Sequence, residues 1–244
     1  MRIKVLEDQA SFVNYAASRI AQMAIATLEV NPTFSLVLTG GSTPVPIYER
    51  LAHPNFANAI DWQRVRIFFG DERCVPPDHL DSNFGMAHKT LLQHVPIPEE
   101  QIHRLKGEMN PQSAALEYET TVRTFLDQHP PGFDLMLLGM GDDGHAASLF
   151  PGTDAINEKE RWVIAHHVDK LDAWRLTMTP PLLNRSENVM FIVTGSSKSA
   201  ALRQVLEGDF QPMLYPAQII RPDNRMLTWV VDSAAAEELT IETE

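Results

Sequence analysis

The sequence predicts an α/β fold, with a mostly parallel sheet and helices on both of its faces. Short unbroken apolar runs, typical of strands buried on both faces, alternate along the chain with segments of helical periodicity. At least five strands alternate with helices in this way, which indicates successive βαβ units. The chain has 244 residues, 44% of them hydrophobic, and no linker-like segment. We therefore expect one domain over residues 1–244 with a sizeable core.

The expected strands are the apolar runs of the sequence. The first is expected at an edge of the sheet, and several of the others run directly into glycine or polar residues. They lie at Ile3–Leu6, Ser35–Thr39, Arg64–Phe69, Leu135–Leu138, Trp162–Ala165, Asn188–Thr194 and Arg225–Val231.

The expected helices lie between these strands. Asn31-Pro32 ends the first helix, because the residue before a proline disfavours the helical conformation. Pro44 suits the first turn of the second helix. The helical segments are Asp8–Glu29, a segment from Pro44, Phe84–His94, Pro111–Gln128 and Ser199–Glu207, with a short turn at Thr179–Asn184 and a helix opening at Ala146–Phe150.

Composition argues against several classes of function. The net charge of -12 disfavours a nucleic-acid partner or a membrane-surface role, since both need a basic face. Cys74 is the only cysteine, so no intramolecular disulfide forms, which fits a reducing, cytoplasmic location. We expect no signal peptide, no zinc cluster and no apolar run near the ~20 residues that span a bilayer.

Glycines and charged residues follow four of the expected strands. Gly40–Thr43 and Asp71–Arg73 follow the second and third strands, His145 follows Leu135–Leu138, and Lys198 follows Asn188–Thr194. If these strands are parallel, their carboxyl ends meet at one edge of the sheet, where open α/β folds place their sites. The resulting pocket is basic within an acidic protein. It suits a small anion, most simply a phosphorylated metabolite.

Two glycine-rich loops partly match the motifs of nucleotide-binding sites. Gly139, Gly141 and Gly144 match the G-x-G-x-x-G spacing. That pattern lies in the middle of the chain, and no clear ribose-binding acid follows about 20 residues later. Gly40–Thr43 offers backbone amides at a helix N-terminus, which suits a phosphate, but it lacks the lysine and the spacing of a Walker loop. A dinucleotide site is therefore not expected.

The same residues carry a resemblance to a known family. The chain resembles the 6-phosphogluconolactonases, in the wider group of glucosamine-6-phosphate deaminase and ribose-5-phosphate isomerase. The resemblance implies a three-layer Rossmann-like fold, no metal and no redox or other cofactor. It implies hydrolysis of 6-phospho-D-glucono-1,5-lactone to 6-phospho-D-gluconate in the oxidative pentose phosphate pathway. The matching blocks run nearly end to end: L-T-G-G-S-T-P at 38–44, F-F-G-D-E-R at 68–73, D-S-N at 81–83, G-M-G-D-D-G-H-A-A-S-L-F-P-G at 139–152, W-R-L-T-M-T at 174–179 and T-G-S-S-K-S-A-A-L at 194–202.

On this reading, His145 is the general base that activates water, because an imidazole exchanges protons near neutral pH. Asp143 orients the imidazole or holds a sugar hydroxyl. Amides of the glycine loop or Arg73 meet the oxyanion. Ser148 does not lie in a G-x-S-x-G elbow, so no serine nucleophile is expected. The residues expected to bind the substrate are Gly40, Gly41, Ser42, Thr43, Asp71, Arg73, Gly141, Arg175 and Lys198, and the sequence leaves open which cation holds which group.

Two alternatives remain on the sequence alone. A deaminase or isomerase of the same group calls for a glutamate five residues after the histidine, where this chain has Phe150. A non-enzymatic sugar-phosphate-binding module usually accompanies a DNA-binding domain, for which the chain has no spare segment or basic helix. The expected partner is a small phosphorylated sugar lactone, bound by a monomer or a weak homo-oligomer.

Overall fold

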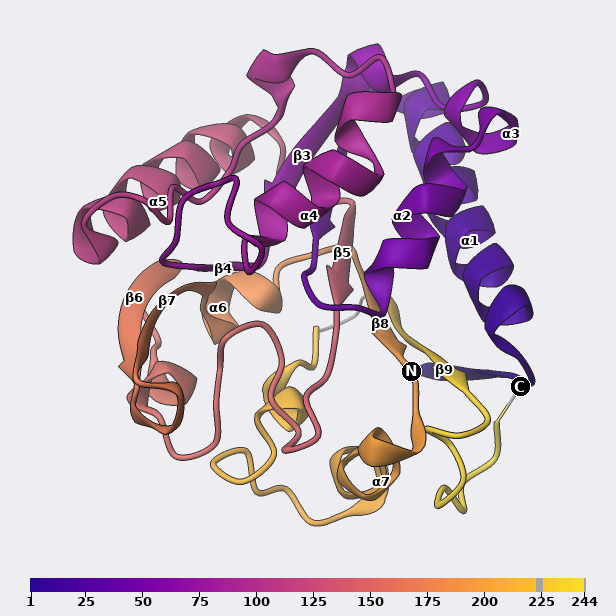
Figure 1. The fold of residues 1–244 in the computed structure, drawn as a ribbon, viewed down its shortest axis with the longest axis vertical. Helices are drawn as coiled ribbons and strands as arrows, with labels where there is room; N and C mark the ends of the chain where they lie inside the picture. The colour runs from indigo at the N-terminus through magenta and orange to yellow at the C-terminus, as the bar shows by residue number, and fades with distance from the viewer. Residues whose placement is uncertain (223–225, 244) are drawn as a thin grey trace.

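The computed structural model describes residues 1–222 and 226–243, and a six-stranded sheet forms the centre of the fold (Figure 1). Its strand order is β1-β9-β8-β5-β2-β3, and each neighbouring pair is parallel. The predicted parallel sheet and the edge position of its first strand are thereby confirmed. The strands are β1 (Arg2–Leu6), β2 (Phe34–Leu38), β3 (Val65–Phe69), β5 (Leu135–Leu138), β8 (Asn188–Val193) and β9 (Met226–Asp232).

Helices flank this sheet and complete a three-layer arrangement. In Figure 1, α1 (Gln9–Val30) and α2 (Pro44–Ala52) pack together on one side of the strands, and α5 (Pro111–Gln128) lies on the other. Asp8 caps α1 by accepting a hydrogen bond from the Ser11 amide. The remaining α-helices are α3 (Pro54–Ala57), α4 (Asn83–Thr90), α6 (Pro180–Leu183) and α7 (Ser199–Glu207), and short 3-10 helices lie at Trp62–Arg64, Leu92–His94, Glu99–Gln101, Asp154–Asn157, Asp169–Leu171, Ser196–Lys198 and Pro216–Ile219.

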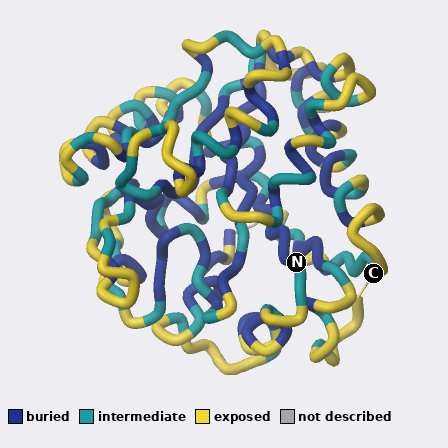
Figure 2. Tube along the Cα trace, viewed as in Figure 1, coloured by how far each residue is buried: buried dark blue, intermediate teal, exposed yellow. Residues whose placement is uncertain are grey.

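The core lies between these layers. All residues of β2 and β5 are buried, which is why both strands appear in the sequence as unbroken apolar runs. Figure 2 shows buried residues along the central strands and exposed residues along the outer helices and loops. Within the described part of the chain, no helix is both long and apolar enough to cross a membrane.

A second, smaller sheet was not predicted. It is antiparallel, with the order β4 (Asp71–Arg73), β7 (Ala173–Met178) and β6 (Val163–Val168). The three residues of β4 are charged, so the sequence gives no strand pattern there. Gly70 links the two sheets, because its carbonyl accepts a hydrogen bond of 2.8 Å from the Met178 amide. The charged triplet after β3 is therefore held in a strand.

Two helix predictions differ from the structure. The helix expected to open at Ala146–Phe150 is wrong: Ala147 has a φ of 49°, and Ala146 forms an isolated β-bridge with Leu149. A residue with positive φ cannot continue a right-handed helix. The helix expected over Phe84–His94 ends at Thr90, and a separate 3-10 turn follows over Leu92–His94. The predicted last strand began at Arg225, which lies outside the described residues.

The strand order brings four loops to one edge. Strands β8, β5, β2 and β3 are consecutive neighbours in the sheet. Their registers place Leu38 beside Phe69 and Leu138 beside Phe191, so the four strands end within a few residues of one another. The loops that leave these four strands therefore begin side by side.

Candidate active site

A pocket of about 220 Å³ lies where these four loops meet. The structure brings most of the sequence-predicted site residues to its wall. Two predicted residues, Asp143 and Arg175, do not line the pocket, although each contacts or neighbours a residue that does. The predicted residues in the wall are Gly40, Gly41, Ser42, Thr43, Asp71, Arg73, Gly141, His145 and Lys198.

His145 and Asp143 form the central pair of this site. The Nδ1 atom of His145 lies 2.6 Å from Oδ1 of Asp143. The other carboxylate oxygen of Asp143 accepts a hydrogen bond of 3.1 Å from Nζ of Lys170, which belongs to the 3-10 turn after β6. Asp143 therefore joins the glycine loop after β5 to the second sheet.

The electrostatics of this pair define the tautomer of His145. Burial raises the pKa of the Asp143 carboxyl, but the hydrogen bond and charge of His145, followed by Lys170, outweigh burial and lower that pKa well below its usual range. Asp143 is thus an ionised acceptor, and Nδ1 of His145 must carry the hydrogen that it donates. Nε2 of a neutral imidazole is then left as the basic atom.

Packing holds the imidazole as well. The ring of Phe150 lies against it, and Gly141 lies so close that an added Cβ would collide with the ring. The Gly141 amide donates a hydrogen bond of 2.9 Å to the His145 carbonyl. That amide was predicted to contribute to anion binding. The amide is already bonded to His145, so Gly141 serves the site by leaving room for the imidazole.

Three cations near the pocket form no direct ion pair with a carboxylate of the described residues. No ion pair among residues 1–222 and 226–243 involves Arg73, Arg175 or Lys198. Arg73 and Arg175 lie opposite each other in the β4–β7 pair. Burial, followed by the charge of Arg73, lowers the pKa of the Arg175 guanidinium. Like charges placed side by side are relieved when an anion binds between them.

The loop after β2 adds backbone donors to the same pocket. Gly41 has a φ of 92°, a conformation that favours glycine, and a side chain at Gly40 would collide with Asn83. In the part of the chain that the structure describes, the amides of Gly40, Gly41 and Ser42 have no acceptor. They lie at the N-terminus of α2, which starts at Pro44, and such free amides bind anions.

Asp71 and Glu72 have different roles despite being adjacent. Asp71 lines the pocket, and its carboxylate accepts hydrogen bonds from Ser148 and Asn83. Glu72 points away from the pocket and caps α4, accepting hydrogen bonds from the amides of Asn83 and Phe84. Burial raises the pKa of the Glu72 carboxyl against the effect of these bonds. Asp71 is the member of the pair that can meet a ligand.

Three polar residues of the site were not predicted from the sequence. Asn83 and Thr194 line the pocket, and Lys170 holds Asp143. Asn83 ends the polar D-S-N block and is the first residue of α4. This polar block was the one feature of the sequence that could have indicated Asn83 as a site residue. The contact of Lys170 with Asp143 spans 27 positions of the sequence, and no local pattern indicates it.

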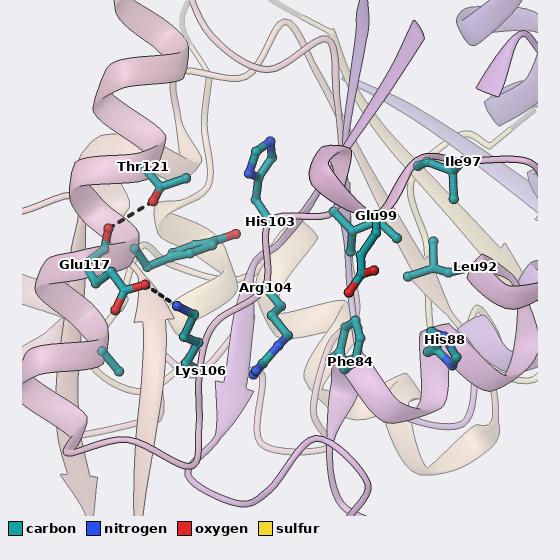
Figure 3. Close-up of a pocket in the computed structure, with 13 residues that line it drawn as sticks. Phe84, His88, Leu92, Ile97, Glu99, His103, Arg104, Lys106, Glu117 and Thr121 are labelled. Carbon is teal, nitrogen blue, oxygen red and sulfur yellow. Dashed lines mark hydrogen bonds and ion pairs between the residues drawn. The ribbon is translucent and has the colours of Figure 1, made fainter. Parts of the chain in front are cut away.

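Another cavity, of about 480 Å³, lies between α4, α5 and the segment 97–106 (Figure 3). Its lysine and arginine side chains already have partners, since Lys106 pairs with Glu117 and Arg104 pairs with Glu108. None of the predicted site residues lines it. The unpaired cations and the His145–Asp143 pair place the candidate active site at the sheet edge instead.

No three His, Cys, Asp or Glu side chains within residues 1–222 and 226–243 gather closely enough to hold a metal ion. The chemistry that the site residues themselves offer is a proton acceptor at His145, free amides and unpaired cations. Fold and site together define an α/β protein suited to acid–base chemistry on a small anion.

Comparison with known proteins identifies the family. The family model "Glucosamine-6-phosphate isomerases/6-phosphogluconolactonase" matches residues 7–229. A 6-phosphogluconolactonase of Nostoc sp. is 37% identical over 243 residues, covering 98% of each chain. The chain therefore belongs to the glucosamine-6-phosphate isomerase/6-phosphogluconolactonase family.

Solved structures agree with this assignment at the level of the fold. The crystal structure of a 6-phosphogluconolactonase from Thermotoga maritima matches with a TM-score of 0.81 and 31% identity, covering 95% of this chain and 99% of that one. A monomeric glucosamine-6-phosphate deaminase matches with a TM-score of 0.83 but 20% identity, covering 98% of this chain and 100% of that one. Since both activities occur on this fold, the site must distinguish them.

Proposed function

We propose that this chain hydrolyses 6-phospho-D-glucono-1,5-lactone to 6-phospho-D-gluconate in the oxidative pentose phosphate pathway. The observation that carries the proposal is the His145 imidazole, held at Nδ1 by Asp143, in the wall of a pocket that also contains unpaired cations. Relatives named 6-phosphogluconolactonase support the choice of substrate.

His145 is the general base in this mechanism. Nε2 takes a proton from a water molecule as the water oxygen attacks the lactone carbonyl carbon. The negative charge moves to the carbonyl oxygen. When that tetrahedral intermediate collapses, the bond to the ring oxygen breaks, and the imidazolium returns the proton to the departing oxygen. Asp143 stabilises the transient imidazolium because its low pKa keeps it ionised.

The remaining groups bind the substrate. Lys198, Arg73 and the free amides of the 40–43 loop are suited to the phosphate and to the oxyanion. Arg175 adds positive charge from the neighbouring strand. Asp71 accepts hydrogen bonds from sugar hydroxyls. No covalent nucleophile is required, because a lactone is reactive toward water and the Ser148 hydroxyl is buried and bonded to Asp71.

We also propose that the protein acts in the cytoplasm, as one domain over residues 1–244 and as a monomer or weak homo-oligomer. The single cysteine fits a reducing compartment.

The His145→Ala variant tests the role of the imidazole. General-base catalysis contributes about 10²- to 10⁴-fold, so we expect a loss of that size in lactone hydrolysis. The measurement is a pH-stat or coupled assay, corrected for spontaneous hydrolysis. A loss under tenfold would contradict the general-base assignment.

The deaminase alternative has its own test. A deaminase of this group calls for a glutamate where this chain has Phe150, whose side chain cannot transfer a proton. We expect no ammonia when the protein is incubated with glucosamine-6-phosphate. Enzymatic ammonia release in the absence of lactone hydrolysis would reverse the choice between the two activities.

A further inference from the structure

A buried hydrogen-bonded chain connects the second sheet to the pocket through Ser148. The Ser148 side chain donates a hydrogen bond of 2.6 Å to Oδ2 of Asp71. Its amide donates to Oγ1 of Thr177 at 3.2 Å, and its carbonyl accepts from Nε2 of His166 at 2.8 Å. Ser148 is 1% exposed, and Thr177 is fully buried.

Each of these contacts restricts what Ser148 can do. Oγ1 of Thr177 donates its own hydrogen to the Met178 carbonyl, so it can only accept from Ser148. The Ser148 carbonyl can only accept, so His166 must carry a hydrogen on Nε2. Both partners hold the backbone of Ser148, and its hydroxyl is left for Asp71.

Asp71 receives a second hydrogen bond on its other oxygen. Nδ2 of Asn83 lies 3.2 Å from Oδ1 of Asp71 and also donates to the Asp71 carbonyl, at 2.9 Å. Ser148 and Asn83 thus hold the carboxylate from both sides. A carboxylate has about four acceptor sites, so it keeps free lone pairs where it lines the pocket.

We propose that Ser148 and His166 are positioning residues, which fix the Asp71 carboxylate as the acceptor of substrate hydroxyls. This inference rests on the proposed function for the identity of the substrate. Ser148 acts through Asp71, and His166 acts through Ser148. The loop that carries the base at His145 thereby also fixes, three residues later, the group that orients the sugar.

A double-mutant cycle tests whether Ser148 acts through Asp71. The parent, Ser148→Ala, Asp71→Asn and the double variant are compared by kcat and KM for the lactone. Losing a hydrogen bond to a charged group costs about tenfold or more, so we expect Ser148→Ala to lower kcat/KM about tenfold, mainly by raising KM. In the Asp71→Asn background, the same change should cost less than twofold. An equal loss in both backgrounds, or none in the parent, would overturn the proposal.

His166 has a matched control in its neighbour. His167 points to the other side of β6, where it pairs with the exposed Asp169 and Asp172. We expect His166→Ala to reproduce the loss seen in Ser148→Ala, and His166→Gln, which keeps an N–H donor, to restore most of it. His167→Ala should behave like the parent. Equal losses in His166→Ala and His167→Ala would show that His166 has no specific role.

Crystal structures of the parent and of Ser148→Ala keep this test separate from the proposed function. The proposed function fails if the parent does not accelerate lactone hydrolysis. The positioning role fails if the Asp71 carboxylate keeps its orientation when the Ser148 hydroxyl is removed, whatever the substrate is.

Discussion

The ring of Phe150 lies against the imidazole of His145, with the ring centroids 4.2 Å apart and the planes inclined by 34°. Phe150 is 8% exposed, so its ring is buried where it packs against the imidazole. The hydrogen bond to Asp143 holds one edge of the imidazole, and Phe150 covers one of its faces. Two different kinds of contact therefore determine the orientation of the proposed base.

Removing the Phe150 ring should lower kcat more than it changes KM. Without that surface, the imidazole can occupy other rotamers, and misplacing a catalytic group by about 1 Å can cost up to about 100-fold. We expect about a tenfold lower kcat for Phe150→Ala and a smaller loss for Phe150→Leu, which keeps most of the volume. Steady-state kinetics of lactone hydrolysis separate the change in kcat from the change in KM. An unchanged kcat in Phe150→Ala would mean that Asp143 alone is sufficient to hold the imidazole.

Gly141 should not tolerate a side chain. The Cβ of Gly141→Ala would occupy the position of the imidazole, so the ring must move away from Asp143. We expect at least a tenfold loss of kcat with the fold retained. Gly70→Ala is the matched control, because the atoms nearest to its Cβ lie at an ordinary 3.8 to 3.9 Å. Equal activity in the two variants would show that the imidazole can move without consequence.

Asp143 should contribute to stability in a pH-dependent way. Burial alone would raise the pKa of its carboxyl, but His145 and then Lys170 lower that pKa below the unfolded value of about 3.9. A lowered pKa means that the unfolded chain binds the proton more tightly, so stability is gained as pH rises. The contribution is complete above about pH 4 to 5 and is lost as pH falls through the folded pKa.

Urea unfolding of the parent and of Asp143→Asn checks this expectation. The parent should be the more stable protein at pH 7, and the difference should shrink progressively below about pH 4. A difference that stays constant or grows on acidification would be evidence against the ionised Asp143.

Lys198 should bind substrate without taking part in the chemical step. It lines the pocket and has no ion-pair partner among the described residues. We expect Lys198→Ala to raise KM about tenfold or more with little change in kcat, because the phosphate is held equally in the ground state and the transition state. Lys89→Ala, an exposed lysine of α4 outside this pocket, is the control. If Lys198→Ala binds the lactone as tightly as the parent, Lys198 does not belong to the anion site.

Much of the local structure could be predicted from the sequence. The bounds of α5 and α7 match the prediction at both ends. The glycine-rich loop before Pro44 was placed correctly because Pro suits the first turn of a helix. The helix predicted at Ala146–Phe150 does not form, because Ala147 adopts a positive φ while Ser148 is hydrogen-bonded to Asp71 and Thr177. Long-range hydrogen bonds overrode the local helical preference there.

The sequence by itself determined which residues we propose to carry the chemistry, since His145, Asp143, Arg73 and Lys198 each follow a recognisable strand. Tertiary structure decided how they meet. The order β8-β5-β2-β3 brings their loops to one edge, strand β6 of the second sheet supplies His166, and the turn after β6 supplies Lys170. Strand order and the contact of Phe150 with His145 depend on how distant surfaces pack together. Residue spacing along a chain records periodicity within one element, and it contains no information about which elements become neighbours.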